Sequence, residues 1–173
     1  MSDSDPPRDL DILLGRADDV HAEVFVRAPE AGDTTRITGS FTGPHRGSDT
    51  TLPITARLQP TAMAGVARAI ITEPAYWTPD LPNLYRLQAT IERTNESSTS
   101  VDRPLGLRRL GVRGRSLWLD GRRWVPRGVL ANAPDLDACK AAQVAAVVAD
   151  PDERILARAD ALGVRSEEHT SEL

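Results

Sequence analysis

The chain has 173 residues, a formal net charge of −4 and a single cysteine. The near-neutral balance gives no global electrostatic attraction to nucleic acid or to an anionic membrane. One thiol excludes an internal disulfide and a zinc site with several thiolates, and the length suits one domain or one domain with part of a second.

Residues 1–17 are acidic, polar and contain proline, so we expect a disordered tail there. The start of the chain lacks a basic stretch followed by an apolar core, and we expect no signal peptide. No apolar run approaches the roughly 20 residues that span a bilayer. We therefore expect a cytoplasmic protein with no membrane partner. Lys140 is the only lysine among 21 basic residues, which is typical of a GC-rich bacterial genome.

Short runs with β-strand patterns occupy residues 18–103. The runs are Val20–Val26, Arg36–Thr42, Leu52–Leu58, Val66–Thr72 and Leu84–Ile91. In the clearest of them, Leu84–Ile91, every second side chain from Tyr85 onward is apolar, as expected for a strand with one buried face. The breaks between the runs are rich in Gly, Pro, Ser, Thr and Asp. Alternating strands without helical stretches predict a β-sandwich.

Trp77–Tyr85, with the sequence WTPDLPNLY, interrupts these strands. Pro79 and Pro82 remove backbone donors, so the stretch cannot pair in a central sheet. One hypothesis makes Trp77 and Tyr85 a platform that stacks on a sugar. The other makes them buried residues of a structural corner, which we favour because buried aromatic side chains mostly serve packing.

After residue 105 the pattern changes from alternating strands to strands and helices in turn. Leu117–Val125 predicts a tight hairpin, because Asp120-Gly121 suits a two-residue turn with positive φ values. Pro134–Gln143 predicts a helix that Asp135 caps, and Val144–Ala149 predicts a strand buried on both faces. A second helix is predicted to start at Asp150-Pro151 and to end before Gly163. Strand, helix, strand, helix in this order predicts right-handed parallel β/α units.

Two phrases, Trp77–Tyr85 and Gly106–Gly128, together resemble a junction in family 2 glycoside hydrolases, the β-galactosidase, β-glucuronidase and β-mannosidase group. In that family an immunoglobulin-like sandwich is followed there by a catalytic (β/α)8 (TIM) barrel. The resemblance implies that the hairpin closes the floor of the barrel and that Arg127–Leu130 is the first barrel strand. It implies a fragment of a glycosidase that acts on a carbohydrate substrate, with domains at residues 18–103 and 104–164.

A retaining glycosidase needs two carboxyl groups about 5–5.5 Å apart. The family supplies both from later barrel strands, so we assign no catalytic residue, and we expect no cofactor and no metal. Two residues follow strands on the expected active face, Asn132 and Asp150, and each is a candidate for substrate binding. The competing interpretation makes Asn132 a turn residue and Asp150 a helix cap.

Departures from the family pattern leave a second hypothesis open. The first strand is followed by Ala131-Asn132-Ala133 where the family has Asn and then His-Glu, and the second lacks an Arg and a nearby His. In this second hypothesis the parent protein contains a degenerate, non-catalytic barrel that binds carbohydrate or assists assembly. A third hypothesis, binding to nucleic acid, rests on arginines between residues 103 and 127 interleaved with Trp118 and Trp124. We disfavour it because arginine clusters without net positive charge are usually solvated.

The last nine residues, Arg165–Leu173, match one reading frame of a common sequencing adapter letter for letter. We expect this segment to be an artefact and not part of the fold. Two β/α units cannot close a barrel, so the strand at Val144–Ala149 is expected to offer an unpaired apolar edge. The full chain is therefore expected to associate.

Overall fold

A computed structural model describes residues 10–29, 35–47, 52–94, 97–130, 133–148 and 152–168. In chain order its elements are β1 (Asp11–Ala17), β2 (His21–Arg27), β3 (Arg36–His45), β4 (Ile54–Arg57), β5 (Gln59–Pro60), β6 (Val66–Thr72), β7 (Leu84–Glu92), β8 (Thr99–Leu105), β9 (Leu110–Arg113), β10 (Ser116–Leu119), β11 (Arg122–Trp124), β12 (Gly128–Leu130), α1 (Leu136–Ala142), β13 (Ala145–Val148), α2 (Glu153–Leu162) and β14 (Ser166–Glu168).

The chain divides into two compact units, and each is described here by itself. Unit 1 consists of Met1–Gly43, Pro53–Pro74 and Arg86–Arg103. Unit 2 consists of Pro44–Leu52, Ala75–Tyr85 and Pro104–Leu173. Segment Ala75–Tyr85 therefore groups with the C-terminal part of the chain, although the strands on either side of it belong to unit 1.

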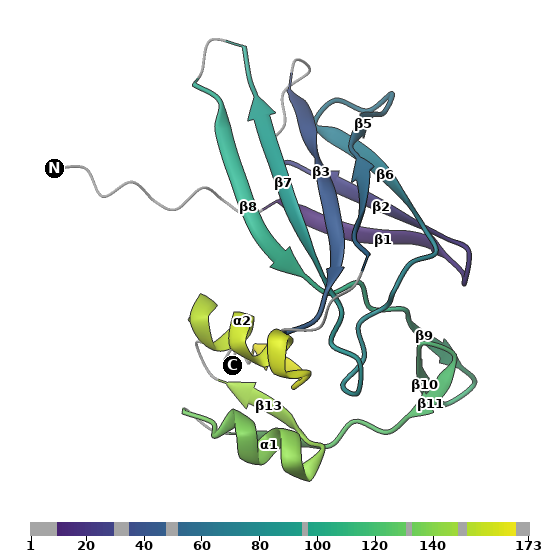
Figure 1. The fold of residues 1–173 in the computed structure, drawn as a ribbon, viewed down its shortest axis with the longest axis vertical. Coiled ribbons are helices and arrows are strands. Elements are labelled where there is room, and N and C mark those ends of the chain that lie inside the picture. The colour runs from purple at the N-terminus through teal and green to yellow at the C-terminus, as the bar shows by residue number, and fades with distance from the viewer. Residues whose placement is uncertain are drawn as a thin grey trace, which may run out of the picture. The chain divides into compact units, whose positions relative to one another are not determined.

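Unit 1 contains two sheets of four strands, with the orders β1-β2-β6-β5 and β4-β3-β7-β8 (Figure 1). The pairs β1/β2, β2/β6, β5/β6 and β3/β4 are antiparallel. This arrangement confirms the predicted β-sandwich. Strand β6 has the predicted bounds, β2 is shifted from prediction by one residue at each end, and β7 extends one residue further at its C-terminal end.

Alternate side chains of the central strands form the core of unit 1. In β2 the buried residues are Ala22, Val24 and Val26, each fully enclosed. Val20, which the alternation pattern also placed inward, precedes the strand and is 56% exposed. The buried set continues on the neighbouring strands with Ile37, Phe41, Ala67, Ala69, Ile71, Leu87, Ala89 and Ile91. Burial of apolar area on this scale is the main favourable term in the folding of such a unit.

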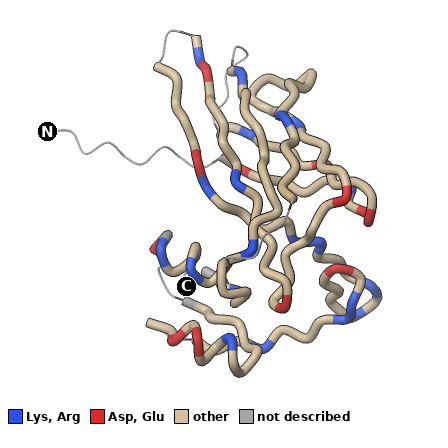
Figure 2. Tube along the Cα trace, viewed as in Figure 1, with Lys and Arg blue, Asp and Glu red and all other residues tan. Residues whose placement is uncertain are grey.

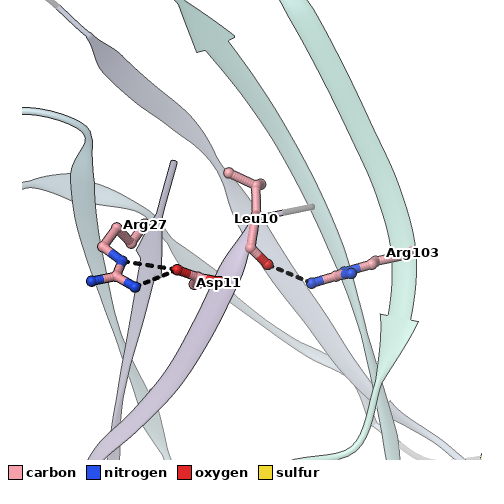
Figure 3. Close-up of polar contacts among 4 residues, drawn as sticks. All are labelled: Leu10, Asp11, Arg27 and Arg103. Atoms are coloured by element: carbon pink, nitrogen blue, oxygen red, sulfur yellow. Dashed lines mark hydrogen bonds and ion pairs between the residues drawn. The ribbon is translucent and has the colours of Figure 1, made fainter. Parts of the chain in front are cut away.

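Strand β1 corrects the expectation of a disordered tail over residues 1–17. Asp11–Ala17 pairs with β2, and Leu10 just before it is 1% exposed. Figure 3 shows an ion pair and a hydrogen bond at the start of the strand: Arg27 Nε and Nη2 lie 2.9 and 2.5 Å from Asp11 Oδ2, and Arg103 Nη2 donates to the Leu10 carbonyl oxygen at 2.7 Å. The acidic composition gave no sign of a strand whose first acid is an ion-pair partner and which follows a buried leucine.

A three-stranded sheet in unit 2, with the order β11-β10-β9, contains the predicted hairpin. Leu117 pairs with Trp124 and Leu119 with Arg122 across the turn. Asp120 and Gly121 have φ values of 48° and 75°, the positive pair that a primed two-residue turn requires. The hairpin prediction is confirmed, and β9 adds a strand that the sequence did not reveal.

The rest of unit 2 is a parallel sheet, β12-β13-β14, with helices α1 and α2 between its strands. Helices and sheet share a small core of buried residues: Leu136, Cys139, Ala146, Ala159 and Val164. The parallel order agrees with the predicted β/α units. Strand β14 lies within residues 165–173, which were expected to take no part in the fold, and its parallel pairing with β13 corrects that expectation for Ser166–Glu168. No helix within the described ranges is long and apolar enough to span a membrane.

Of the two predicted helix caps, one is confirmed and the other is corrected. Asp135 caps α1 as predicted, because its carboxylate accepts from the N–H groups of Asp137 and Ala138 at 3.1 and 3.0 Å. Helix α2 begins two residues later than predicted: its cap is Asp152, which accepts from the Ile155 N–H at 2.7 Å. Both Asp150 and Asp152 fit the capping pattern by residue type, and the observed start at Glu153 selects the second.

Candidate functional site

The expected active face lies at the C-terminal ends of β12 and β13. These strands are parallel neighbours, with Gly128 opposite Ala145 and Leu130 opposite Val147, so their C-terminal ends share one edge of the sheet. Asn132 and Asp150, the two candidate sugar-binding residues, follow those ends and both fall outside the described residues. Their roles in substrate binding therefore stay predictions.

Acidic side chains near these strands have structural partners in the described part of the chain. Asp135 and Asp152 cap the two helices, and Arg158 Nη2 lies 2.7 Å from Asp137 Oδ2. Among the described residues there is no group of three or more His, Cys, Asp and Glu side chains that could hold a metal ion. These acids thus stabilise helix ends, and none of them forms a carboxyl pair suited to glycoside hydrolysis.

A hollow of about 540 Å³ lies at the opposite end of the parallel strands. Its wall includes Arg127 and Ala145, which stand at the N-terminal ends of β12 and β13, together with Lys140 and the aromatic rings of Tyr76 and Trp124. Enzymes built from β/α units carry their chemistry at the C-terminal ends of the strands. This hollow is therefore on the face associated with stability, not on the face associated with catalysis.

Arginines of the hairpin region stack on the chain's own aromatic rings. The guanidinium carbons of Arg108, Arg109 and Arg113 lie 4.3, 4.7 and 4.7 Å from the ring centroids of Trp77, Tyr76 and Trp118. Figure 2 shows the basic colouring concentrated over β9–β11. Rings that already carry an arginine present one face less for stacking on nucleic-acid bases, which weakens the basis of the third hypothesis.

Trp77 and Tyr85 are residues of a structural corner, as favoured above. Their side chains are 1% and 0% exposed, so neither ring is available to a sugar. The Tyr85 hydroxyl accepts the Ala75 N–H at 3.0 Å, and burial raises the pKa of this hydroxyl above its ordinary value. Nearby, the Asn83 amide donates to Tyr76 O at 3.1 Å, which satisfies one of the few buried polar side chains.

Asp160, in α2, is a partly buried acid of unit 2. Burial raises the pKa of its carboxyl group, and the ion pair with Arg108 acts in the opposite direction. Arg108 was considered only as one of the arginines of the nucleic-acid hypothesis, and Asp160 was not a candidate site residue. They are separated by 52 positions, and no local pattern announces a contact at that distance.

Comparisons with known proteins give a family and a fold. Residues 15–108 match the model of the family described as glycosyl hydrolases family 2. A search of curated proteins found no match. Among solved structures, the β-D-glucuronidase from Dictyoglomus thermophilum is 14% identical, with a TM-score of 0.63, over 93% of this chain and 28% of its own.

Two further solved structures are similar to this chain. A β-glycosidase from Bacteroides vulgatus is 18% identical, with a TM-score of 0.65, over 91% of this chain and 22% of its own. The β-glucuronidase from Parabacteroides merdae is 19% identical, with a TM-score of 0.56, over 92% of this chain and 23% of its own. The chain thus spans about a quarter of the length of the structures that it matches.

Proposed function

Because the chain belongs to glycosyl hydrolases family 2, we propose that it is the N-terminal part of an enzyme that hydrolyses O-glycosidic bonds in a β-linked carbohydrate. In this proposal residues 18–103 form an immunoglobulin-like sandwich and residues 104–164 form the hairpin and first β/α units of a (β/α)8 barrel. Residues 165–173 are an artefact of sequencing. The similar structures include β-glucuronidases and a β-glycosidase, which supports a sugar substrate.

The observation that carries the proposal is the order of architectures along the chain. The family match covers residues 15–108; the small sheet β9–β11 comes next, and parallel strands β12 and β13 with helix α1 between them follow it. A parallel pair joined through a helix is the repeating unit of an α/β barrel. An isolated sandwich domain would not need this unit.

We further propose that this chain supplies no catalytic carboxylate. Hydrolysis with retention requires a nucleophile and an acid/base about 5–5.5 Å apart. Asp120 and Asp160 are bound by Arg109 and Arg108, while Asp135 and Asp152 cap helices. The reacting groups would come from the larger share of the parent protein, since this chain covers 22 to 28% of the similar structures.

The test is to recover the intact locus and express its product beside the present chain. Both proteins are assayed with nitrophenyl β-glucuronide, β-galactoside and β-mannoside. We expect turnover by the longer protein and none by the 173-residue chain. In that case we expect the downstream sequence to contain an Asn-Glu pair after the fourth barrel strand and a second Glu after the seventh. Turnover by the present chain alone would contradict the proposal.

A second candidate is a barrel that binds carbohydrate without hydrolysing it. It is favoured by Leu130-Ala131-Asn132-Ala133, which lacks the His-Glu that the family has at this place. In this case the longer protein binds sugars by calorimetry but releases no nitrophenol, and one or both downstream glutamates are missing. Turnover at a rate typical of enzymes, about 1 per second or more, excludes it.

A further inference from the structure

Segment Ala75–Tyr85 contacts the C-terminal ends of both helices in unit 2. The Trp77 indole N–H donates to Asp160 O, in the last turn of α2, at 2.9 Å. Lys140, in the last turn of α1, donates its ammonium group to Pro79 O. The final carbonyls of a helix have no partner within the helix. Asp160 O also accepts the Gly163 N–H at 3.3 Å, so the Trp77 indole is its second donor. The segment therefore adds a hydrogen bond at the end of α2 and accepts a charge-assisted bond from the end of α1.

Arg108 adds a second connection at the same place. Its guanidinium group stacks on the Trp77 ring, 4.3 Å from the centroid, and pairs with the Asp160 carboxylate. The Trp77 backbone N–H also donates to Leu107 O at 2.8 Å, so the segment and residues 107–108 are joined by main chain and side chain. We call Trp77, Arg108 and Asp160 the Trp77 clamp.

The surroundings of the clamp strengthen its electrostatic contacts. The Trp77 side chain is 1% exposed, and those of Arg108 and Asp160 are 35% and 23% exposed. Partial exclusion of water lowers the local dielectric constant and so increases the attraction between the charges. A cation at the C-terminal end of a helix is also favoured by the helix dipole.

The segment has hydrogen bonds of its own. The N–H groups of Leu81 and Asn83 donate to Thr78 Oγ1 and Leu81 O, and the Thr78 N–H donates to Leu81 O. The Ala75 N–H also donates to the Tyr85 hydroxyl, and the Asn83 amide donates to Tyr76 O. Pro79 and Pro82 contribute no N–H. The bonds to Asp160 O, Leu107 O and Lys140 attach this locally bonded segment to residues far along the sequence.

We propose that the Trp77 clamp makes segment Ala75–Tyr85 a cap on helices α1 and α2, so that the segment and these β/α elements open together as one cooperative unit. Cooperative units of this kind combine groups that satisfy each other's buried bonds. The domain boundary that the sequence predicts near residue 103 is then not the boundary of this cooperative unit. A piece of chain that ends in the first residues of β7 belongs energetically to elements that follow β8.

The test is hydrogen exchange of the full chain under native conditions, comparing wild type with Trp77→Phe. This variant keeps an aromatic ring for packing and removes the N–H that bonds to Asp160 O. We expect exchange of amides in residues 75–85 and in α2 to accelerate together, each by about tenfold, because one buried hydrogen bond is lost. Amides of β2 and β6 are expected to keep their wild-type rates.

Trp118→Phe is the matched control. Trp118 also carries a stacked arginine, Arg113, but its indole N–H is buried with no hydrogen-bond partner among the described residues. Its replacement is expected to leave exchange in residues 75–85 unchanged. If Trp77→Phe does not fold, Arg108→Gln is compared with Arg158→Gln, which breaks an exposed pair between the two helices.

Three results would overturn the proposal. One is acceleration in α2 without acceleration in residues 75–85, and another is the reverse. The third is an equal change in β2 and β6, because all amides would then report a single global opening. None of these measurements uses enzymatic activity, so the outcome is independent of whether the parent protein hydrolyses sugars.

Discussion

Gly106 lies against the face of the Trp77 ring, where a side chain has no room. A Cβ atom built on Gly106 lies 2.7 Å from atoms of the Trp77 ring, which is shorter than the contacts that real Cβ atoms make. We predict that Gly106→Ala displaces Trp77 and lowers the free energy of unfolding of unit 2 by about 1–3 kcal/mol, the usual cost of overpacking. The measurement is urea unfolding followed by tryptophan fluorescence.

Gly111 provides the control for this substitution. It stands in β9, and a Cβ atom there meets nothing within 4 Å. Gly111→Ala is expected to change the free energy of unfolding little, or to raise it, because alanine restricts the unfolded chain more than glycine does. Equal losses in the two variants would show that contact with Trp77 is not the cause.

Asp160 and Asp102 are predicted to give opposite pH dependences of stability. Burial raises the pKa of Asp160 above 3.8 in the folded state, so the folded protein binds this proton more readily than the unfolded protein does. Its contribution to stability is present at low pH and is lost as pH rises through the folded pKa. Asp102 has a lowered pKa because Arg86 and Gln88 donate to it, and its contribution is lost as pH falls.

Urea unfolding of wild type, Asp160→Asn and Asp102→Asn, from acid in which both carboxyl groups are protonated to neutral pH, measures both effects, because stability changes where the folded and unfolded states bind different numbers of protons. Relative to wild type, Asp160→Asn should lose stability as pH is lowered, whereas Asp102→Asn should lose stability as pH is raised. Arg108 is the charged group that faces Asp160, and it remains charged throughout this range. Difference curves with the same sign for the two variants would refute the assignment.

At the level of single residues, sequence reasoning identified the role of Trp77 but not its partners. Two prolines inside the segment and two aromatic residues at its ends were enough to predict a buried corner. The bond from Trp77 to Asp160 O spans 83 residues, and nothing in the local sequence marks either end of it. Long-range contacts of this kind depend on how complete elements pack, which no short pattern encodes.

Elements with a local physical signal were predictable. The Asp120-Gly121 turn and the Asp135 cap were both confirmed, because each depends on the conformational preferences of one or two residues. Strand β1 was missed because its first residues are stabilised by Arg27 and Arg103 from other strands. The candidate sites Asn132 and Asp150 follow strands whose parallel pairing was predicted correctly, yet binding by them stays untested.

Strand β12 is the exposed edge of the parallel sheet, and we predict that it causes self-association. In the described part of the chain β12 pairs with β13 alone, and Val129 and Leu130 are 48% and 65% exposed. We expected the free edge of the sheet at Val144–Ala149. In the structure β13 pairs with β12 on one side and with β14 on the other, so it is the central strand and has no free edge. Unpaired apolar edges recruit other strands, and a lysine on the edge opposes this. Leu130→Lys is therefore expected to reduce association in sedimentation velocity experiments.

Met63→Lys is the control for the added charge. Met63 is 68% exposed and lies in the turn before β6, away from any strand edge. This variant should associate as much as wild type at equal concentration, although its net charge changes by the same amount. If both variants reduce association equally, general charge repulsion is the cause and the β12 edge is not.

The two units of the chain differ in how fully their strands bury side chains. Strands β2, β6 and β7 of unit 1 bury alternate side chains along their length, whereas every residue of β9 and β12 in unit 2 is exposed. Since burial of apolar area is the main favourable term, unit 1 should be the more stable of the two. The chain also spans only about a quarter of the similar structures, in which further elements are present.

The distribution of aromatic residues allows this difference in stability to be measured. All three tryptophans, and both tyrosines as well, belong to unit 2, so intrinsic fluorescence reports that unit alone. Far-ultraviolet circular dichroism reports the strands of both units. We predict a fluorescence midpoint in urea below the midpoint of the final dichroism transition, because the units unfold one after the other. Arg86→Ala, which removes an ion pair on β7, should move only the later transition. Coincident curves for both probes would mean that the two units unfold as one, since coincidence is the test of a two-state transition.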